Sequence, residues 1–179
     1  MIHARRCRGM TLPEILVALA IGAALLLLAV PLYRDWIADA ELRDRVEALV
    51  GAMGLARAEA LKRNARVNLC PTDDRRRCAP GGGWENGWLL YADADDDGQP
   101  DGAGPPIRVE GPSRPGITIR GNRPVADYVS YTGLGQTRMR NGALQMGTFT
   151  VCRAGRAAVL VILANGGRVR VERTRDACP

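Results

Sequence analysis

The chain has 179 residues, which suits one domain with an appendage. Lys and Arg number 25 against 19 Asp and Glu, so the formal net charge is +6. Hydrophobic residues make up 46% of the chain, which excludes a wholly disordered protein. The single histidine, His3, leaves little room for histidine-based catalysis or a multi-histidine metal site, and we therefore do not expect an enzyme.

An apolar segment near the N-terminus predicts a membrane-spanning helix. Residues 15–32 carry no charge, and as a helix they would extend about 27 Å, close to the hydrocarbon thickness of a bilayer. Arg5, Arg6 and Arg8 precede the segment, so the positive-inside rule keeps the first residues in the cytoplasm. A cleaved secretory signal peptide and a plain signal anchor are alternatives. Neither accounts for Glu14, a carboxylate just inside the apolar segment.

The residues around Glu14 resemble the type IV prepilin signature, in which a basic leader ends in glycine and glutamate is the fifth mature residue. Gly9, Met10 and Glu14 hold the three key places, with Met10 where phenylalanine is usual. The resemblance implies cleavage between Gly9 and Met10 by a prepilin peptidase, and N-methylation of the new terminus. It also implies a bacterial inner-membrane protein that crosses once and later joins a pilus or pseudopilus. There, Glu14 would offset the positive N-terminus of a neighbouring subunit.

Beyond the membrane segment, residues 34–64 predict an amphipathic helix that ends near Asn64. Its apolar face recurs at spacings of three and four residues and comprises Leu42, Val46, Leu49, Met53, Ala56 and Ala60. We therefore expect four segments: a cleaved leader at residues 1–9, a transmembrane helix at 10–33, the amphipathic helix at 34–64 and a periplasmic β-rich head at 65–179.

Short strands separated by turns rich in glycine and proline are predicted for the rest of the chain. Asn165, Gly166 and Gly167 form a favourable hairpin turn between the last two strands, because Asn and Gly tolerate positive φ. The expected class is α+β, with a long N-terminal helix packed on a mainly antiparallel sheet. The expected strands are residues 66–70, 87–92, 107–110, 117–120, 128–131, 148–152, 157–163 and 168–172.

Several fragments of the head resemble the GspH/FimT group of minor pilins and pseudopilins. The fragments are residues 56–64, 67–71, 84–88, 149–152 and 167–170, and they follow one another in the order found in that group. The resemblance covers essentially the whole chain. It implies a type IV pilin-like fold and a role in assembly with other pilins or minor pilins.

Five cysteines are present, and removal of the leader would remove Cys7 and leave four. A periplasmic head would favour disulfides, and four cysteines allow three pairings. We favour Cys70 with Cys78, which closes a short loop, and Cys152 with Cys178, which holds the C-terminal tail beside its hairpin. A zinc site would need tighter spacing.

An acidic loop follows the second predicted strand. Asp93, Asp95, Asp97 and Asp101 occupy positions 1, 3, 5 and 9 of a calcium-type loop, with Gly98 at position 6. The glutamate expected at position 12 is missing. A solvated acidic loop is the plain interpretation, and weak or structural Ca²⁺ binding is the alternative. We expect no other cofactor.

Arginines gather toward the C-terminus, where residues 138–179 hold eight of them against two acids. Arg168 and Arg170 are two apart on a predicted strand and would project to one face, with Arg173 and Arg175 continuing the row and Val169 and Val171 facing the core. Two such guanidiniums can bridge successive phosphates. A solvated strand face is the plain alternative.

In the FimT branch of the group, a C-terminal Gly-Arg-x-Arg element is associated with DNA binding in natural transformation, and residues 167–170 match it. The resemblance implies a competence role in which Arg168, Arg170, Arg173 and Arg175 bind double-stranded DNA. No aromatic residue follows Phe149, so binding would be independent of base sequence and sensitive to salt. The alternative function is that of a structural minor pilin or type II secretion pseudopilin that primes or caps a filament.

Overall fold

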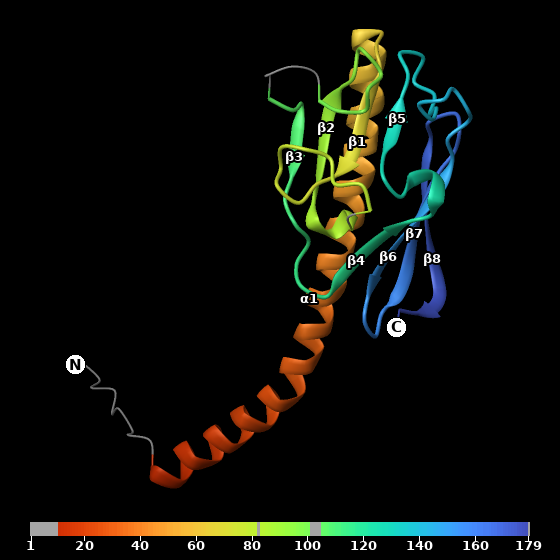
Figure 1. The fold of residues 1–179 in the computed structure, drawn as a ribbon. Coiled ribbons are helices and arrows are strands. Elements are labelled where there is room, and N and C mark those ends of the chain that lie inside the picture. The colour runs from red at the N-terminus through yellow and green to blue at the C-terminus, as the bar shows by residue number, and fades with distance from the viewer. Residues whose placement is uncertain (1–10, 82, 101–104, 179) are drawn as a thin grey trace, which may run out of the picture. The chain divides into compact units, whose positions relative to one another are not determined.

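The computed structural model describes residues 11–81, 83–100 and 105–178, so the expected leader lies outside the described residues. The chain divides into two compact units, Met1–Ala40 and Glu41–Pro179. One long helix is followed by strands, and every strand pair in the described part of the chain is antiparallel (Figure 1). This arrangement confirms the predicted α+β class.

Helix α1 spans Leu12–Arg63 without interruption. It ends where the sequence predicted, because Asn64 adopts the left-handed conformation with φ 48°. The amide of Asn64 donates to the carbonyl of Leu61, and the amide of Ala65 donates to that of Ala60, both at 3.3 Å. These two hydrogen bonds form a Schellman motif, which satisfies carbonyls that the end of a helix would otherwise leave unpaired.

The first part of α1 is exposed and apolar. Its most apolar 18-residue window has a mean hydropathy of 2.8 and buries none of its side chains within the protein. Among the described residues, α1 is the one helix long and apolar enough to cross a membrane by length and composition. Tyr33 and Trp36, each 62% exposed, follow this apolar stretch.

Among the described residues of the second unit, eight strands form two four-stranded sheets. The first sheet has the order β3-β2-β1-β5, and the second has the order β4-β6-β7-β8. The strands of the first sheet are β1 (Val67–Pro71), β2 (Trp88–Ala92), β3 (Arg108–Glu110) and β5 (Val129–Tyr131). Those of the second are β4 (Ile117–Gly121), β6 (Gly147–Arg153), β7 (Ala157–Leu163) and β8 (Val169–Ala177).

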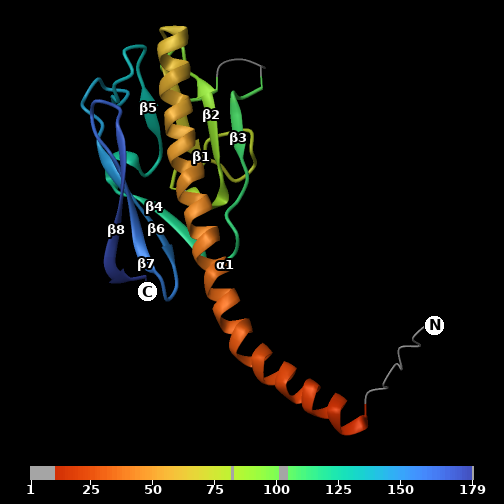
Figure 2. The same cartoon turned by 180° about the vertical axis from the view of Figure 1, so that it is seen from behind.

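The larger of two hydrophobic clusters among the described residues joins the second half of α1 to both sheets. The helix contributes the predicted apolar face, in which Leu49, Met53, Ala56 and Ala60 are fully buried. Seen from behind, this half of α1 runs alongside the strands (Figure 2). Alternate residues of β6 and β7, such as Phe149 and Val161, point into the same core and leave the other face of the second sheet to solvent.

Arg45 is a buried charge that links α1 to strand β3 and the loop after it. Its guanidinium lies 4.1 Å from the ring centre of Trp88, donates a 2.7 Å hydrogen bond to the carbonyl of Gly111 and approaches Glu110 at 3.5 Å. Contacts with an aromatic face, a carbonyl and a carboxylate offset part of the free-energy cost of removing this cation from water. Arg45 therefore helps to fix β3, the short edge strand of the first sheet.

Each predicted strand is present with its ends at most one residue from the prediction, except that β8 continues five residues further than expected, to Ala177. Two 3-10 helices, Trp84–Asn86 and Arg123–Val125, lie in segments for which no element was predicted. Trp84 and Val125 are buried, so tertiary packing rather than local pattern holds these short turns.

Candidate functional site

The β7–β8 hairpin positions the predicted arginine motif. The amide of Ala164 donates to the carbonyl of Arg168 at 2.9 Å, and the amide of Gly167 donates to that of Ala164 at 2.8 Å. Gly167 has φ 77°, and a Cβ there would lie 2.2 Å from the carbonyl oxygen of Gly135. Only glycine fits both requirements, so the turn is tightly specified immediately before Arg168.

Arg168 and Arg170 lie together on the exposed face of the second sheet. Arg170 stands opposite Ile162 in the β7–β8 register, and both arginines are exposed. They border an open hollow of about 700 Å³. Polar side chains of Asn122, Thr148 and Asn165 also line this hollow, and no acidic residue is among its described lining.

Glu172 forms an ion pair with one member of this pair. Its carboxylate lies 3.2 Å from Nε of Arg170, and both side chains are at least half exposed. The two residues are neighbours on one face of β8 because they are two positions apart. Arg170 is therefore partly neutralised, whereas Arg168 has no ion pair with any described acid. The same alternation that placed the two arginines on one face would have revealed Glu172 from the sequence.

Arg173 does not continue the row, which corrects the expectation from the sequence. It pairs in register with Val159, whose side chain faces the core, so Arg173 lies on the opposite face from Arg170. There it lines an apolar groove of about 480 Å³ with Val171, Val46 and Val50 on α1, among others. Val171 is likewise 47% exposed rather than buried in the core as expected, whereas Val169 packs against the core.

Arg175 lies in an irregular stretch of β8. The register passes from the Val159–Arg173 pair to the Ala157–Ala177 pair, so three residues of β8 face Ala158 alone. This bulge separates Arg175 from the regular alternation that carries Arg168 and Arg170. Of the four predicted arginines, Arg168 and Arg170 therefore lie together, and Arg173 and Arg175 lie elsewhere on the strand.

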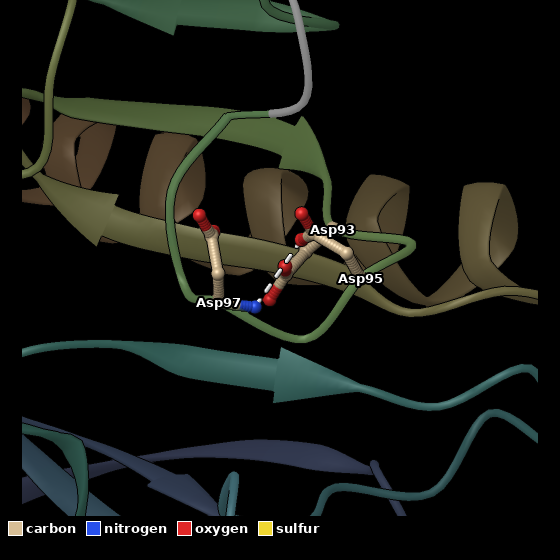
Figure 3. Close-up of side chains that lie close together, drawn as sticks. All are labelled: Asp93, Asp95 and Asp97. Atoms are coloured by element: carbon tan, nitrogen blue, oxygen red, sulfur yellow. Dashed lines mark hydrogen bonds between the residues drawn. The ribbon is translucent and has the colours of Figure 1, made fainter.

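The acidic loop brings three of its four predicted residues together. The carboxylate oxygens of Asp93, Asp95 and Asp97 lie within 4.8 Å of one another, and Figure 3 shows the three side chains converging inside the loop after β2. Asp101 lies outside the described residues. The amide of Gly98 donates to Asp93 at 3.2 Å, and the amide of Gln99 donates to Asp97 at 2.6 Å.

Asp93 differs from its neighbours because it is fully buried. Burial raises the pKa of its carboxyl group, while hydrogen bonds from Gly98 and Asn68 partly oppose that shift. Asn68 comes from β1, and its contact with Asp93 could not be read from the loop sequence. The available signal was a polar residue, Asn68, between Val67 and Leu69 in a predicted strand.

The processing residues are described only in part, since Gly9 and Met10 lie outside the described residues. Glu14 lies in the first turn of α1, where its carboxylate accepts a 3.4 Å hydrogen bond from the amide of Thr11. This contact is the glutamate half of a capping box. Glu14 therefore has a partner in Thr11, the residue immediately before α1.

The structure joins the cysteines in the pairs that the sequence favoured, Cys70 with Cys78 and Cys152 with Cys178. The first bridge closes the loop after β1. The second ties the residue after β8 to β6, across the intervening strand β7. The end of β8 is held in place by this bridge as well as by pairing with β7.

A long apolar N-terminal helix that continues into a head of antiparallel sheets defines a pilin-like protein. The family model of the type II transport protein GspH matches residues 45–167, and that of the prokaryotic N-terminal methylation motif matches residues 4–30. The chain belongs to the GspH family. It is therefore a minor type IV pilin or pseudopilin of the GspH type. Membership of this family implies assembly with other pilins in a filament.

Solved structures with the same fold are similar to most of the chain. The type IV minor pilin FimU of Pseudomonas aeruginosa strain PAO1 is 17% identical, with a TM-score of 0.60 over 80% of this chain and 99% of FimU. The minor pseudopilin EpsH from the type 2 secretion system of Vibrio cholerae is 12% identical, with a TM-score of 0.51 over 76% of this chain and 99% of EpsH. No curated protein sequence matches the chain.

Proposed function

We propose that this GspH-type pilin binds double-stranded DNA through Arg168 and Arg170 and thereby serves DNA uptake in natural transformation. The observation that carries the proposal is the placement of the two exposed guanidiniums side by side at the rim of a hollow whose described lining contains no acidic residue. Its work is binding and assembly rather than catalysis.

Phosphate contacts account for the expected chemistry. Residues two apart on a strand are separated by about 7 Å, so Arg168 and Arg170 can each take a different phosphate oxygen on one backbone. Asn122, Thr148 and Asn165 add hydrogen-bonding groups around the same hollow. Since no aromatic residue follows Phe149 in the sequence, base stacking contributes little and sequence preference is weak.

The setting of this activity follows from the N-terminal helix. The protein is cleaved between Gly9 and Met10 by a prepilin peptidase and is anchored in the bacterial inner membrane by the first part of α1. The head then faces the periplasm, where disulfides such as Cys70–Cys78 persist. Incorporation into a pilus would carry the arginine pair to extracellular DNA.

The test measures binding of a fluorescent DNA duplex to the full-length protein in detergent across a salt series. We expect the affinity for DNA to fall steeply as the salt concentration rises. The Arg168→Gln/Arg170→Gln variant should bind the duplex at least about tenfold more weakly, and the slope of log affinity against log salt concentration should become shallower by about two. The matched control is Arg76→Gln/Arg77→Gln, which removes the same charge from an exposed loop next to the first sheet. Absence of salt-dependent binding, or an equal loss in the control, would refute the proposal.

A structural role without DNA binding is the second candidate. The ion pair between Arg170 and Glu172 favours it, because a strand that neutralises its own arginine needs no external anion. In that case the protein primes or caps a pilus or a type II secretion pseudopilus, and its arginines face water or another subunit. The duplex-binding experiment separates the two functions directly.

A further inference from the structure

The hollow beside the arginine pair extends across strands β6, β7 and β8, which lie side by side (Figure 1). Thr148 on β6 pairs with Ile162 on β7, and Ile162 pairs with Arg170 on β8. On the other side of Thr148, its main-chain carbonyl accepts a 3.0 Å hydrogen bond from the amide of Asn122. These four residues form one row across the sheet, and all of them line the hollow. The middle of the row is uncharged, and its β8 end is a guanidinium.

The neighbouring row, two residues away along each strand, bounds the hollow on one side. It consists of Arg120, Thr150, Leu160 and Glu172, paired in that order. None of these four residues is among the described lining of the hollow. Arg120 is held by Glu85 at 2.8 Å, and the β8 end of the row is a carboxylate. A phosphate group is therefore favoured in the hollow and repelled at the next row.

The concave shape of this surface decides which part of a DNA molecule fits it. A duplex presents two grooves, about 12 and 6 Å wide, and the sugar–phosphate backbones form ridges between them. A groove receives a projecting protein element such as a helix, whereas a hollow in the protein receives a ridge. The open hollow of about 700 Å³ is therefore complementary to one backbone and not to a groove.

We propose that this hollow holds the sugar–phosphate backbone of a single DNA strand, with two successive phosphates against Arg168 and Arg170. The side chains of Thr148 and Ile162 lie beneath the deoxyribose units, and Asn122 and the other polar groups of the lining donate to phosphate oxygens. The inference rests on the proposed DNA binding and adds the part of the DNA that is recognised. Because one strand supplies every contact, single-stranded DNA is a ligand of the same site.

The first test fills the hollow without changing any charge, in the full-length protein in detergent with a fluorescent duplex. Thr148→Phe should weaken binding at least about tenfold, because the ring takes the place of the backbone. The matched control is Thr150→Phe, which makes the same change on the same strand and face but outside the hollow. It should stay within about twofold of the wild type.

A second pair of variants on β7 covers poor folding of Thr148→Phe, which its melting temperature would reveal. Ile162→Phe fills the hollow from the neighbouring strand, and Leu160→Phe is its control outside the lining. The same tenfold loss and the same unchanged control are expected for this pair, since Ile162 and Thr148 are register partners.

The second test compares the duplex with one of its strands alone. The single strand should bind within about threefold of the duplex, at equal nucleotide concentration. Two phosphate contacts correspond to a salt slope of about −1.8 on a duplex and about −1.4 on a single strand. The Arg168→Gln/Arg170→Gln variant should lose slopes of about these sizes on the two ligands.

Three results would overturn this inference and leave the proposed function standing. One is duplex binding that is lost in Arg168→Gln/Arg170→Gln but kept when Phe fills the hollow, since the arginines would then act from a flat surface. Another is an equal loss in each filling variant and its control. The third is a single strand that binds more than about tenfold more weakly than the duplex, because both strands would then be needed. Absence of DNA binding by the wild type would overturn both.

Discussion

Glu172 would oppose the proposed DNA binding at the arginine pair, because its carboxylate lies 3.2 Å from Nε of Arg170. Replacing Glu172 by Gln removes this competitor and keeps the size of the side chain. An exposed ion pair of this kind is worth about 0.2 to 1 kcal/mol. We therefore expect Glu172→Gln to bind a DNA duplex about two- to fivefold more tightly at low salt, measured by fluorescence anisotropy.

Asp176→Asn is the control for net charge. It makes the same change of charge on β8, within the irregular stretch between Arg173 and Ala177 and away from the arginine pair. A gain of equal size in both variants would show that overall charge, rather than the release of Arg170, improves binding. No gain in Glu172→Gln would mean that Arg170 does not contact the phosphates.

Strand β8 depends on its disulfide more than the other strands of its sheet do. It is an edge strand with a charged sequence, and in its last five residues the register is irregular. Cys152–Cys178 closes a loop of 26 residues, for which the chain-entropy relation gives about 3.5 kcal/mol. Cys70–Cys78 spans only 8 residues, for which the same relation gives about 2.5 kcal/mol.

We therefore expect Cys152→Ser/Cys178→Ser to lower the free energy of unfolding by more than Cys70→Ser/Cys78→Ser does. Urea denaturation of the full-length protein in detergent measures both values. Hydrogen exchange should also show loss of protection confined to the end of β8 in the first variant, because β7 remains paired with β6. Two results would contradict this view of β8. One is an equal loss of unfolding free energy in the two double variants, and the other is unchanged hydrogen-exchange protection of residues 173–177 in Cys152→Ser/Cys178→Ser.

The strand pattern and the turn residues made most of the second unit predictable. The Asn64 helix stop, the strand positions and both cysteine pairs follow from local sequence, because each depends on neighbours along the chain or on simple loop closure. The end of β8 does not, since residues 173–177 lack an apolar alternation and are held by a disulfide and cross-strand pairing. The prediction for Arg173 and Arg175 was wrong for two reasons. Arg173 is three positions from Arg170, so the alternation of a strand places it on the opposite face, and Arg175 lies in a bulge where the regular alternation is interrupted.

The candidate sites were predictable in their charged residues and not in their surroundings. Arg168 and Arg170 follow from a motif, and Asp93, Asp95 and Asp97 follow from loop spacing. The polar groups beside them come from distant segments, as Asn122 and Thr148 do for the arginine pair and Asn68 for the loop. Such contacts depend on sheet register, which a single sequence specifies only weakly.

At the scale of the whole molecule, the proposed function requires that the N-terminus is processed before the chain enters a filament. Glycine at position 9 leaves the backbone open to close approach by a peptidase, and Gly9→Val would block this approach with a branched side chain. We expect intact mass spectrometry of protein from cells with a prepilin peptidase to show a chain that begins at Met10 and carries one added methyl group. Gly9→Val should keep residues 1–9 and accumulate in the membrane without entering filaments.

Gly22→Val is the matched control for that change, because a side chain at Gly22 would meet nothing within 4 Å in the structure. It places the same residue in the apolar part of α1 and should be processed normally. Retention of residues 1–9 in the wild type would refute cleavage at Gly9. Normal cleavage of Gly9→Val would show that the peptidase does not read this glycine. The prediction thus tests whether the N-terminal motif governs the entry of this GspH-family chain into a filament, whatever its head binds.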